Sequence, residues 1–261
     1  MEPVPLRGLR AAASFLTRVP AGGGHEGPSD LARSLPWFPV VGALLGLALA
    51  GLYAGARLAT PPFLGASLTL GVAMLLTGGF HEDGLADTAD ALGGGWNREE
   101  SLRILKDPRH GTYGVLALVL SVLIRASALA TLDGWAALAV LPAAHALSRG
   151  AAVGLLGWVK PASTEGLGAT YFGFVTRGRA LTAGAAAVLI AVAAMGLWGL
   201  PAGLLTVLGA AAVVRLAMRK LGGVTGDVLG AVQQAGEMLV LLLGAMAAFG
   251  SWPGIPWWPS A

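Results

Sequence analysis

The chain contains no cysteine and few charged residues, since Asp, Glu, Lys and Arg together make up only 12% of its 261 residues. The lack of cysteine excludes a disulfide scaffold. Average proteins are about 25% charged, so the low charge excludes a soluble cytosolic domain, and an apolar share of 55% excludes intrinsic disorder. Glycine is abundant, with 40 residues, and glycine within apolar runs is typical of closely packed transmembrane helices. The composition therefore predicts a multispanning membrane protein.

Apolar runs with few or no charges divide the chain into about seven predicted transmembrane helices. A helix needs about 20 apolar residues to cross the hydrocarbon core of a bilayer. Residues 180–214 contain no charge and are too many for one crossing, so we expect the stretch 197–201, which holds Gly and Pro, to break them into two helices. The other predicted helices cover residues 37–56, 63–80, 111–132, 135–158 and 228–249.

The fold class predicted from this pattern is all-α, a polytopic integral membrane helix bundle with an active site on its cytoplasmic face. We expect a single membrane domain over residues 1–261. Within it, residues 1–35 form a cytoplasmic or interfacial segment, residues 36–249 form the bundle, and residues 250–261 form an interfacial tail.

Positive charge is concentrated in alternate polar segments of the predicted topology. With seven crossings, one face of the membrane receives 13 of the 17 Lys and Arg residues, in segments 1–35, 81–110, 159–179 and 219–227. Cytoplasmic loops carry such an excess of Lys and Arg, so we expect the N-terminus and the active site on the cytoplasmic side of a bacterial or archaeal inner membrane. The same bias accounts for the net charge of +3, which therefore requires no nucleic-acid partner.

Four carboxylates within nine residues form the most informative polar segment. Asp83, Asp87 and Asp90 follow at i, i+4 and i+7, within roughly 60° of one helix face, and Glu82 precedes them. Like charges on one stripe repel, and a Mg²⁺ ion, which takes one or two carboxylates with water and phosphate oxygens, would offset that repulsion. The alternative is a juxtamembrane helix whose acids face water or pair with arginines. His81 could contact a phosphate or serve only as a hydrogen-bonded fixture.

A basic stretch precedes the predicted helix at 111–132. Lys106, Arg109 and His110 there could bind a phosphate group, because cations supply charge and a helix N-terminus supplies free N–H donors. The alternative is a positively charged anchor on the cytoplasmic side.

A glycine turn opens the last predicted helix and ends in Thr225, Gly226 and Asp227. It offers backbone donors, a hydroxyl and a carboxylate at a helix start. It could equally be only a capped turn.

Three charged residues lie inside predicted membrane helices, namely Arg125, Arg149 and Glu237. Charge within a membrane is costly and usually faces a bundle interior or a wet cavity. Glu237 could therefore pair with Arg125 or Arg149 as a structural ion pair, or the three could line a polar cavity that reaches in from the cytoplasmic face.

Several motifs together resemble one family of membrane enzymes. These motifs are GGFHEDGLADTADAL at 78–92, LKDPRHGTYGVLALVL at 105–120, SRG at 148–150, GGVTGDVLGA at 222–231, SFLTRVP at 14–20 and LPWFPVVGALLG at 35–46. They are similar to those of the cobalamin synthases, also called adenosylcobinamide-GDP ribazoletransferases, and the resemblance extends from about residue 9 to residue 245.

The resemblance implies a Mg²⁺-dependent transferase of the last steps of adenosylcobalamin (vitamin B12) biosynthesis. Such an enzyme joins adenosylcobinamide-GDP to α-ribazole, or to α-ribazole 5′-phosphate, and releases GMP. The expected partners are these substrates and the lipid bilayer, with self-association possible. We expect Glu82, Asp83, Asp87 and Asp90 to hold the metal, His81 with Asp90 or Asp227 to act in catalysis, and Lys106, Asp107, Arg109, Arg149, Thr225 and Gly226 to bind substrate.

Two other functions compete with this interpretation. One is another Mg²⁺-dependent membrane phosphotransferase or prenyltransferase acting on a diphosphate, although the CDP-alcohol phosphotransferase pattern needs an Ala-Arg pair where this chain has Leu85, Ala86 and Asp87. The other is a transporter, which would distribute charge through the membrane depth and show internal symmetry. This chain gathers its polar residues on one face and has no evident repeat.

Overall fold

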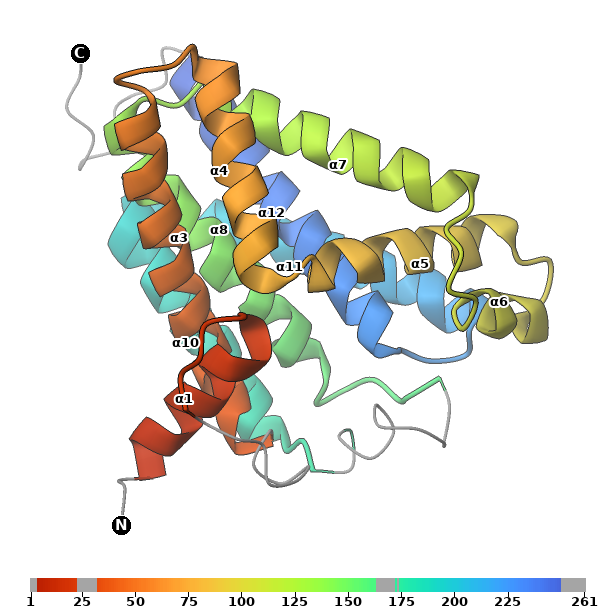
Figure 1. Cartoon of the computed structure of the whole chain (residues 1–261). Helices are drawn as coiled ribbons and strands as arrows, with labels where there is room; N and C mark the ends of the chain where they lie inside the picture. The colour runs from red at the N-terminus through yellow and green to blue at the C-terminus, as the bar shows by residue number, and fades with distance from the viewer. Residues whose placement is uncertain (1–3, 23–31, 163–171, 173, 250–261) are drawn as a thin grey trace.

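The computed structural model describes residues 4–22, 32–162, 172 and 174–249, and this part of the chain is helical apart from one isolated bridge between Pro161 and Val224 (Figure 1). The α-helices are α1 (Val4–Leu16), α3 (Phe38–Ala56), α4 (Pro62–Thr77), α5 (Phe80–Gly94), α6 (Arg98–Ile104), α7 (Thr112–Ala130), α8 (Gly134–Leu155), α10 (Arg177–Met195), α11 (Gly199–Lys220) and α12 (Gly226–Phe249). Two 3₁₀ turns, η1 (Leu35–Trp37) and η2 (Gly196–Trp198), precede α3 and α11. The predicted all-α membrane bundle is confirmed.

Helix α8 forms the centre of the bundle and packs against α3, α10 and α12. It is buried along most of its length, as expected of a helix whose side chains are mostly small and apolar on all sides. Gly42 and Gly46 of α3 bring the two backbones into contact, because a Cβ atom at either position would collide with the carbonyl oxygens of His145 and Leu141. Small residues at such crossings are how membrane helices pack closely.

The seven predicted crossings correspond to α3, α4, α7, α8, α10, α11 and α12, and the described residues contain five or six candidate spans when α10 and α11 are counted together. Five segments are long and apolar enough to cross a membrane, or six if the bent pair α4 and α5 forms one span. Arg177–Lys220 counts once among these segments. Helix α4 has 16 residues, about 24 Å, and falls short of the roughly 30 Å hydrocarbon core on its own.

The predicted break within 180–214 is confirmed. Helix α10 ends at Met195, Gly196 follows with a φ of 58°, and α11 begins at Gly199. A Cβ atom at Gly199 would meet the backbone of Ala191 at 2.5 Å, so α11 starts directly against the last turns of α10. Glycine is needed at both points, once for backbone conformation and once for close approach.

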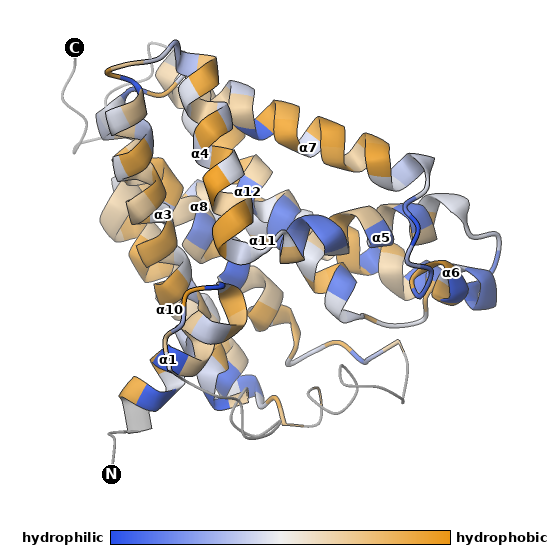
Figure 2. Cartoon of the chain, viewed as in Figure 1, coloured by the Kyte–Doolittle hydropathy of each residue, from blue (hydrophilic) through white to orange (hydrophobic). Residues whose placement is uncertain are grey.

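A second bend turns the acidic segment away from α4. Gly78 and Gly79 have φ values of 73° and 70°, which glycine adopts readily, and the axes of α4 and α5 differ by 92°. The predicted helix at 63–80 therefore ends at Thr77. Helix α5 then packs against α12 and α7, and hydrophilic residues gather on α5, on α6 and in the loop before α7 (Figure 2).

The predicted N-terminal segment at 1–35 contains α1 and ends at Leu35, where η1 begins, and Phe15 of α1 stacks on Phe38 of α3 at a centroid distance of 5.5 Å. The predicted interfacial tail at 250–261 lies outside the described residues.

Candidate active site

Helices α5 and α12 cross where each carries a glycine. A Cβ atom at Gly84 would lie 2.8 Å from the backbone oxygen of Asp227, and one at Gly230 would lie 3.2 Å from the Cα atom of Gly84. The two backbones are therefore in direct contact at this point. The crossing brings the acidic segment of α5 beside the glycine turn of 222–227, so two motifs more than 130 residues apart in sequence form one site.

We expect Gly84→Ala to separate the two helices and to lower both stability and transferase activity. Overpacking a close contact costs about 1–3 kcal/mol, more than the roughly 1 kcal/mol that alanine gains over glycine within a helix. Gly71→Ala in α4 is the matched control, because a Cβ atom there has no neighbour within 4 Å. Thermal unfolding and activity of the purified variants check this prediction, and equal behaviour of the two variants would contradict it.

Three carboxylates gather beside this crossing. Asp83 interacts electrostatically with both Asp87 and Asp227, and Asp87 also interacts with Asp227. Asp83 is exposed, whereas the other two are half-buried. The Nδ1 atom of His110 lies 3.5 Å from Oδ1 of Asp87. Because like charges repel, this carboxylate cluster (Asp83, Asp87 and Asp227) is suited to a cation from outside the chain.

An open polar groove lies beside Asp83, the exposed member of the carboxylate cluster. Asp83 and His110 line it, together with Thr17, Arg18 and Thr77. The backbone N–H of Arg18 donates to the Leu76 carbonyl at 2.7 Å, and its guanidinium packs over Gly78. Arg18 thus brings a cation to the groove, beyond its share in the positive charge of the N-terminal segment. Its position within the SFLTRVP motif was the available signal.

Asp90 has a different position from the other acids of α5. It is 6% exposed, and its two carboxylate oxygens accept the backbone N–H groups of Gly111 at 2.7 Å and Gly114 at 2.8 Å. A Cβ atom at either glycine would collide with the Asp90 carboxylate. Asp90 therefore caps the start of α7, where a negative charge also complements the helix dipole. Two of the N–H donors that we expected there for phosphate, those of Gly111 and Gly114, are engaged by this contact.

We expect Asp90→Asn to lower stability by about 0.5–2 kcal/mol, the usual cost of losing a helix cap, because the amide NH₂ that replaces one carboxylate oxygen cannot accept an N–H group. If Asp90 only positions α7, the apparent affinity for Mg²⁺ in the transfer assay stays at the wild-type value. A large loss of Mg²⁺ affinity at unchanged stability would instead support the predicted role of Asp90 as a metal ligand.

Glu82 turns inward, away from the carboxylate cluster. Its Oε1 atom accepts hydrogen bonds at 3.1 Å from Nη1 and Nη2 of Arg125 and from Nε2 of Gln234. Arg125 also donates to Oε1 of Glu237 at 3.1 Å. Two roles were open for Arg125 and Glu237, a structural ion pair and the lining of a polar cavity. The structure contains the buried ion pair, and Glu82 is part of it.

The buried network continues toward α8. Gln233 donates to Oε2 of Glu237 at 2.7 Å, and the His145 Nδ1 atom lies 3.3 Å from the same oxygen. Arg149 contacts the His145 Nδ1 atom at 2.9 Å and donates to its carbonyl oxygen at 3.2 Å. Burying such charges is favourable only when they are paired, and two arginines here balance Glu82 and Glu237.

In the basic stretch before α7, His110 is the residue that contacts the carboxylate cluster in the described structure. Lys106 is exposed, and the Arg109 side chain is 85% exposed and donates to Asp107 at 2.8 and 2.9 Å. These hydrogen bonds lower the pKa of Asp107 to about 2. The predicted substrate-binding residues Lys106, Asp107 and Arg109 thus form an exposed patch beside the site.

Thr225 caps α12, as predicted if the glycine turn is a capped turn. Its Oγ1 atom accepts the backbone N–H of Val228 at 3.3 Å and donates to Oδ2 of Asp227 at the same distance. Gly226 is exposed next to it. The cap orients the Asp227 carboxylate.

The carboxylate cluster fits a Mg²⁺ ion only as part of a shared coordination sphere. Within the described ranges, no three His, Asp or Glu side chains are arranged to hold a metal ion by themselves. Mg²⁺ usually keeps several waters and binds through one or two carboxylates plus substrate phosphates. Asp83 and Asp87, one helical turn apart, offer two such carboxylates.

The fold and the site define a polytopic helical membrane protein whose carboxylate cluster lies beside a polar groove lined by Arg18 and His110, a combination suited to a metal-bound diphosphate. The family described as cobalamin-5-phosphate synthase matches residues 8–245. The chain belongs to this family.

Curated relatives agree with this assignment over nearly the whole chain. A protein of Bradyrhizobium diazoefficiens is 42% identical over 246 residues, which are 93% of this chain and 94% of the relative. One of Escherichia coli is 39% identical over 245 residues (89% and 96%), and one of Ralstonia nicotianae is 36% identical over 255 residues (90% and 93%). All three are named adenosylcobinamide-GDP ribazoletransferase. No solved structure matches the chain.

Proposed function

We infer that this chain is an adenosylcobinamide-GDP ribazoletransferase, a membrane enzyme of the final step of cobalamin biosynthesis. The observation that carries this inference is the family match over residues 8–245, which includes the acidic segment, the start of α7 and the turn before α12. Identities of 36–42% to curated ribazoletransferases over about nine-tenths of the chain support it.

The proposed reaction joins adenosylcobinamide-GDP to α-ribazole or to its 5′-phosphate. The ribazole 3′-hydroxyl attacks the phosphorus attached to the cobinamide, the bond from that phosphorus to the bridging oxygen breaks, and GMP departs. The hydroxyl proton passes to a base on the enzyme. The enzyme must therefore align two substrates, disperse the charge of the diphosphate and accept one proton.

We propose that Asp83 and Asp87 hold Mg²⁺ together with water and the diphosphate oxygens. When bound, Mg²⁺ neutralises charge on the phosphate oxygens during the displacement. Arg18 and His110 line the same groove as Asp83, and we propose that they balance the charge of the departing GMP. Lys106 and Arg109 would approach the nucleotide from the exposed patch nearby.

Among the carboxylates, Asp227 is our candidate for the base. It faces Asp83 and Asp87 across the α5–α12 crossing, and its hydroxyl partner Thr225 fixes its orientation. Both oxygens of Asp90 are already engaged with α7, so we assign Asp90 a positioning task. Glu82, held by Arg125 and Gln234, would likewise support α5 from within.

We propose that the groove opens to the cytoplasm, with the N-terminus on the same side of the cytoplasmic membrane. The excess of Lys and Arg in the segments that flank the groove supports this orientation. Hydrophilic residues also gather at the α5 and α6 end of the molecule (Figure 2).

Release of GMP by the purified, detergent-solubilised protein tests the proposed function. We expect release from adenosylcobinamide-GDP only when α-ribazole (or its 5′-phosphate) and Mg²⁺ are both present, with formation of the corresponding cobalamin. Turnover of a CDP-alcohol or a prenyl diphosphate, with none of adenosylcobinamide-GDP, would overturn it in favour of another membrane phosphotransferase.

A further inference from the structure

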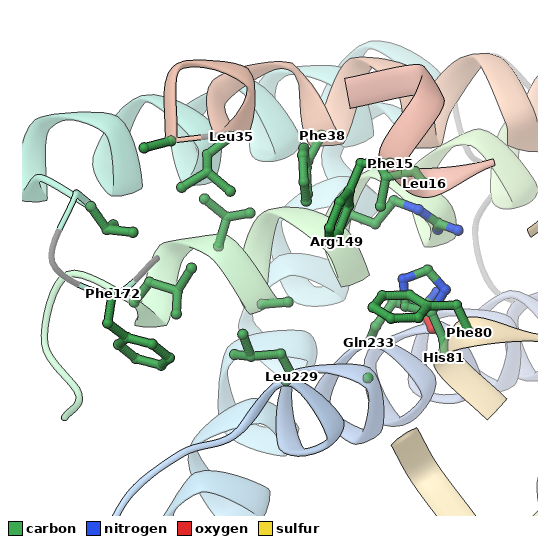
Figure 3. A pocket seen from close by; sticks show the side chains of 17 residues that line it. Phe15, Leu16, Leu35, Phe38, Phe80, His81, Arg149, Phe172, Leu229 and Gln233 are labelled. Carbon is green, nitrogen blue, oxygen red and sulfur yellow. The ribbon is translucent and has the colours of Figure 1, made fainter. Parts of the chain in front are cut away.

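An apolar cavity of about 140 Å³ lies next to the carboxylate cluster, between α1, η1, α5, α8 and α12. Its walls are largely aromatic and aliphatic. Figure 3 shows Phe15, Phe80, His81 and Arg149 gathered toward one end of the cavity and Phe172 at the other. The remaining wall comes mainly from Leu16, Leu35, Phe38, Ala152, Val153, Leu156, Val175 and Leu229.

Polar groups face the cavity at the end where Arg149 lies. Arg149 is 2% exposed, and its Nε atom has no hydrogen-bond partner in the described structure. His81 and Gln233, 6% and 1% exposed, complete this end. A buried guanidinium N–H without a partner is costly, and a ligand with one acceptor atom would satisfy it. Apolar walls with a few convergent polar groups are typical of small-molecule sites.

The cavity is next to the proposed site of phosphoryl transfer. Gly226 and Gly230 of α12 line it, and Asp227 follows Gly226 directly. On the other side, Phe15 and Phe80 line both the cavity and the polar groove. Their rings meet edge to face at a centroid distance of 5.6 Å, so this pair separates an apolar chamber from the groove that contains Asp83.

We propose that this cavity binds the aromatic base of the ribazole substrate. The proposal rests on the function inferred above. The base is a dimethylbenzimidazole, a planar and mostly apolar bicycle with a ring nitrogen that can accept a hydrogen bond. An apolar cavity of about 150 Å³ holds benzene, so this cavity of about 140 Å³ matches the benzenoid ring of the base, with the imidazole ring toward the polar end at Arg149. Guanine carries too many polar groups for these walls, and a corrin is far too large.

Occupancy of the cavity by the base also places the reactive hydroxyl correctly. The ribose follows the base, so its 3′-hydroxyl would lie at the α12 start beside Asp227. The GDP arm would occupy the polar groove beyond Phe15 and Phe80. The apolar cavity thus matches the base of the ribazole in polarity, and the polar groove matches the GDP arm of the other substrate.

The test is to fill the cavity with Ala152→Phe and to measure each substrate separately. We expect the KM for α-ribazole to rise at least about tenfold, the effect of one or two misplaced methyl-sized groups in an apolar pocket, with the KM for adenosylcobinamide-GDP unchanged. Ala151→Phe is the matched control, because Ala151 belongs to the same helix but lines a different hollow with Leu147 and Ala180. It should leave both KM values as in wild type.

A change in base preference separates a filled cavity from a damaged fold. Ala152→Phe should accept the riboside of unsubstituted benzimidazole better than the dimethyl form, whereas wild type should prefer the dimethyl form. Ala152→Leu should shift the preference in the same direction if the phenylalanine variant does not purify. An unchanged KM and base preference in a variant that turns over would overturn the proposal.

The remaining outcomes also discriminate. Unchanged kinetics together with loss of a co-purifying lipid from Ala152→Phe would assign the cavity to an acyl chain. Failure of wild type to release GMP at all would overturn the proposed function. Normal wild-type turnover, with KM values and base preference unchanged in Ala152→Phe, would overturn only the cavity assignment.

Discussion

Asp87→Asn is expected to lower kcat at least about a hundredfold while the protein still inserts and purifies normally. A bound metal ion stabilises the transition state by several kcal/mol, and each 1.4 kcal/mol corresponds to a factor of ten in rate. The neutral amide removes one of the two carboxylates that we assign to Mg²⁺, and one negative neighbour of Asp83 and Asp227. Initial rates at saturating substrates and varied Mg²⁺ measure the effect.

Glu99→Gln is the matched control for this substitution. Glu99 is an exposed carboxylate in the first turn of the neighbouring helix α6, so its neutralisation should leave kcat near the wild-type value. Wild-type rates in both Asp87→Asn and Asp83→Asn would rule out the proposed metal site.

Glu237→Gln is expected to cost about 3–5 kcal/mol of stability, the usual result of removing one partner from a buried ion pair. The loss leaves Arg125 and Arg149 facing Glu82 alone, and all of these side chains lie in the bundle interior. The glutamine cannot replace the charge that Arg125 needs. A large fall in the thermal midpoint in detergent, followed by tryptophan fluorescence, would verify this result.

Restoring the charge balance should recover part of that loss. The double variant Arg125→Met with Glu237→Gln leaves one arginine and one glutamate, so we expect it to be more stable than the sum of its single changes predicts. Strictly additive effects, or a Glu237→Gln protein as stable as wild type, would contradict the charge-balanced network.

The fold follows from the sequence because apolar runs and their breaks are local signals. The interruption at Gly196 and Gly199 is an example, since the length of the uncharged run required a break and the glycines supplied it. The shortness of α4 was harder to predict. Both glycines after Thr77 adopt left-handed conformations, and glycine alone does not reveal whether a helix will end or continue.

The carboxylate cluster was predictable only in part. Spacing on a helix correctly grouped Asp83 with Asp87, because that relation is local. The tasks of Glu82 and Asp90 depend on which helices cover each side of α5. Asp90 meets the start of α7 through Gly111 and Gly114, and Glu82 meets Arg125 and Gln234, both of which are tertiary contacts that a helical wheel does not contain.

Arg18 illustrates the opposite case, in which the residue was visible but its location was not. It reaches the groove because the chain after α1 pairs with the end of α4 through the Arg18 N–H and the Leu76 carbonyl. A positive charge in an N-terminal segment is expected for orientation alone, so only its place in the SFLTRVP motif indicated a further role, and nothing local placed it beside the acids.

The most direct test of the central assignment is metal binding rather than turnover. With Mn²⁺ in place of Mg²⁺, electron paramagnetic resonance of the purified protein with adenosylcobinamide-GDP measures how much of the ion is bound. We predict that wild type binds Mn²⁺ in the presence of the nucleotide and that Asp83→Asn with Asp87→Asn abolishes this binding. Equal Mn²⁺ affinity in the double variant and the wild type would contradict the assignment.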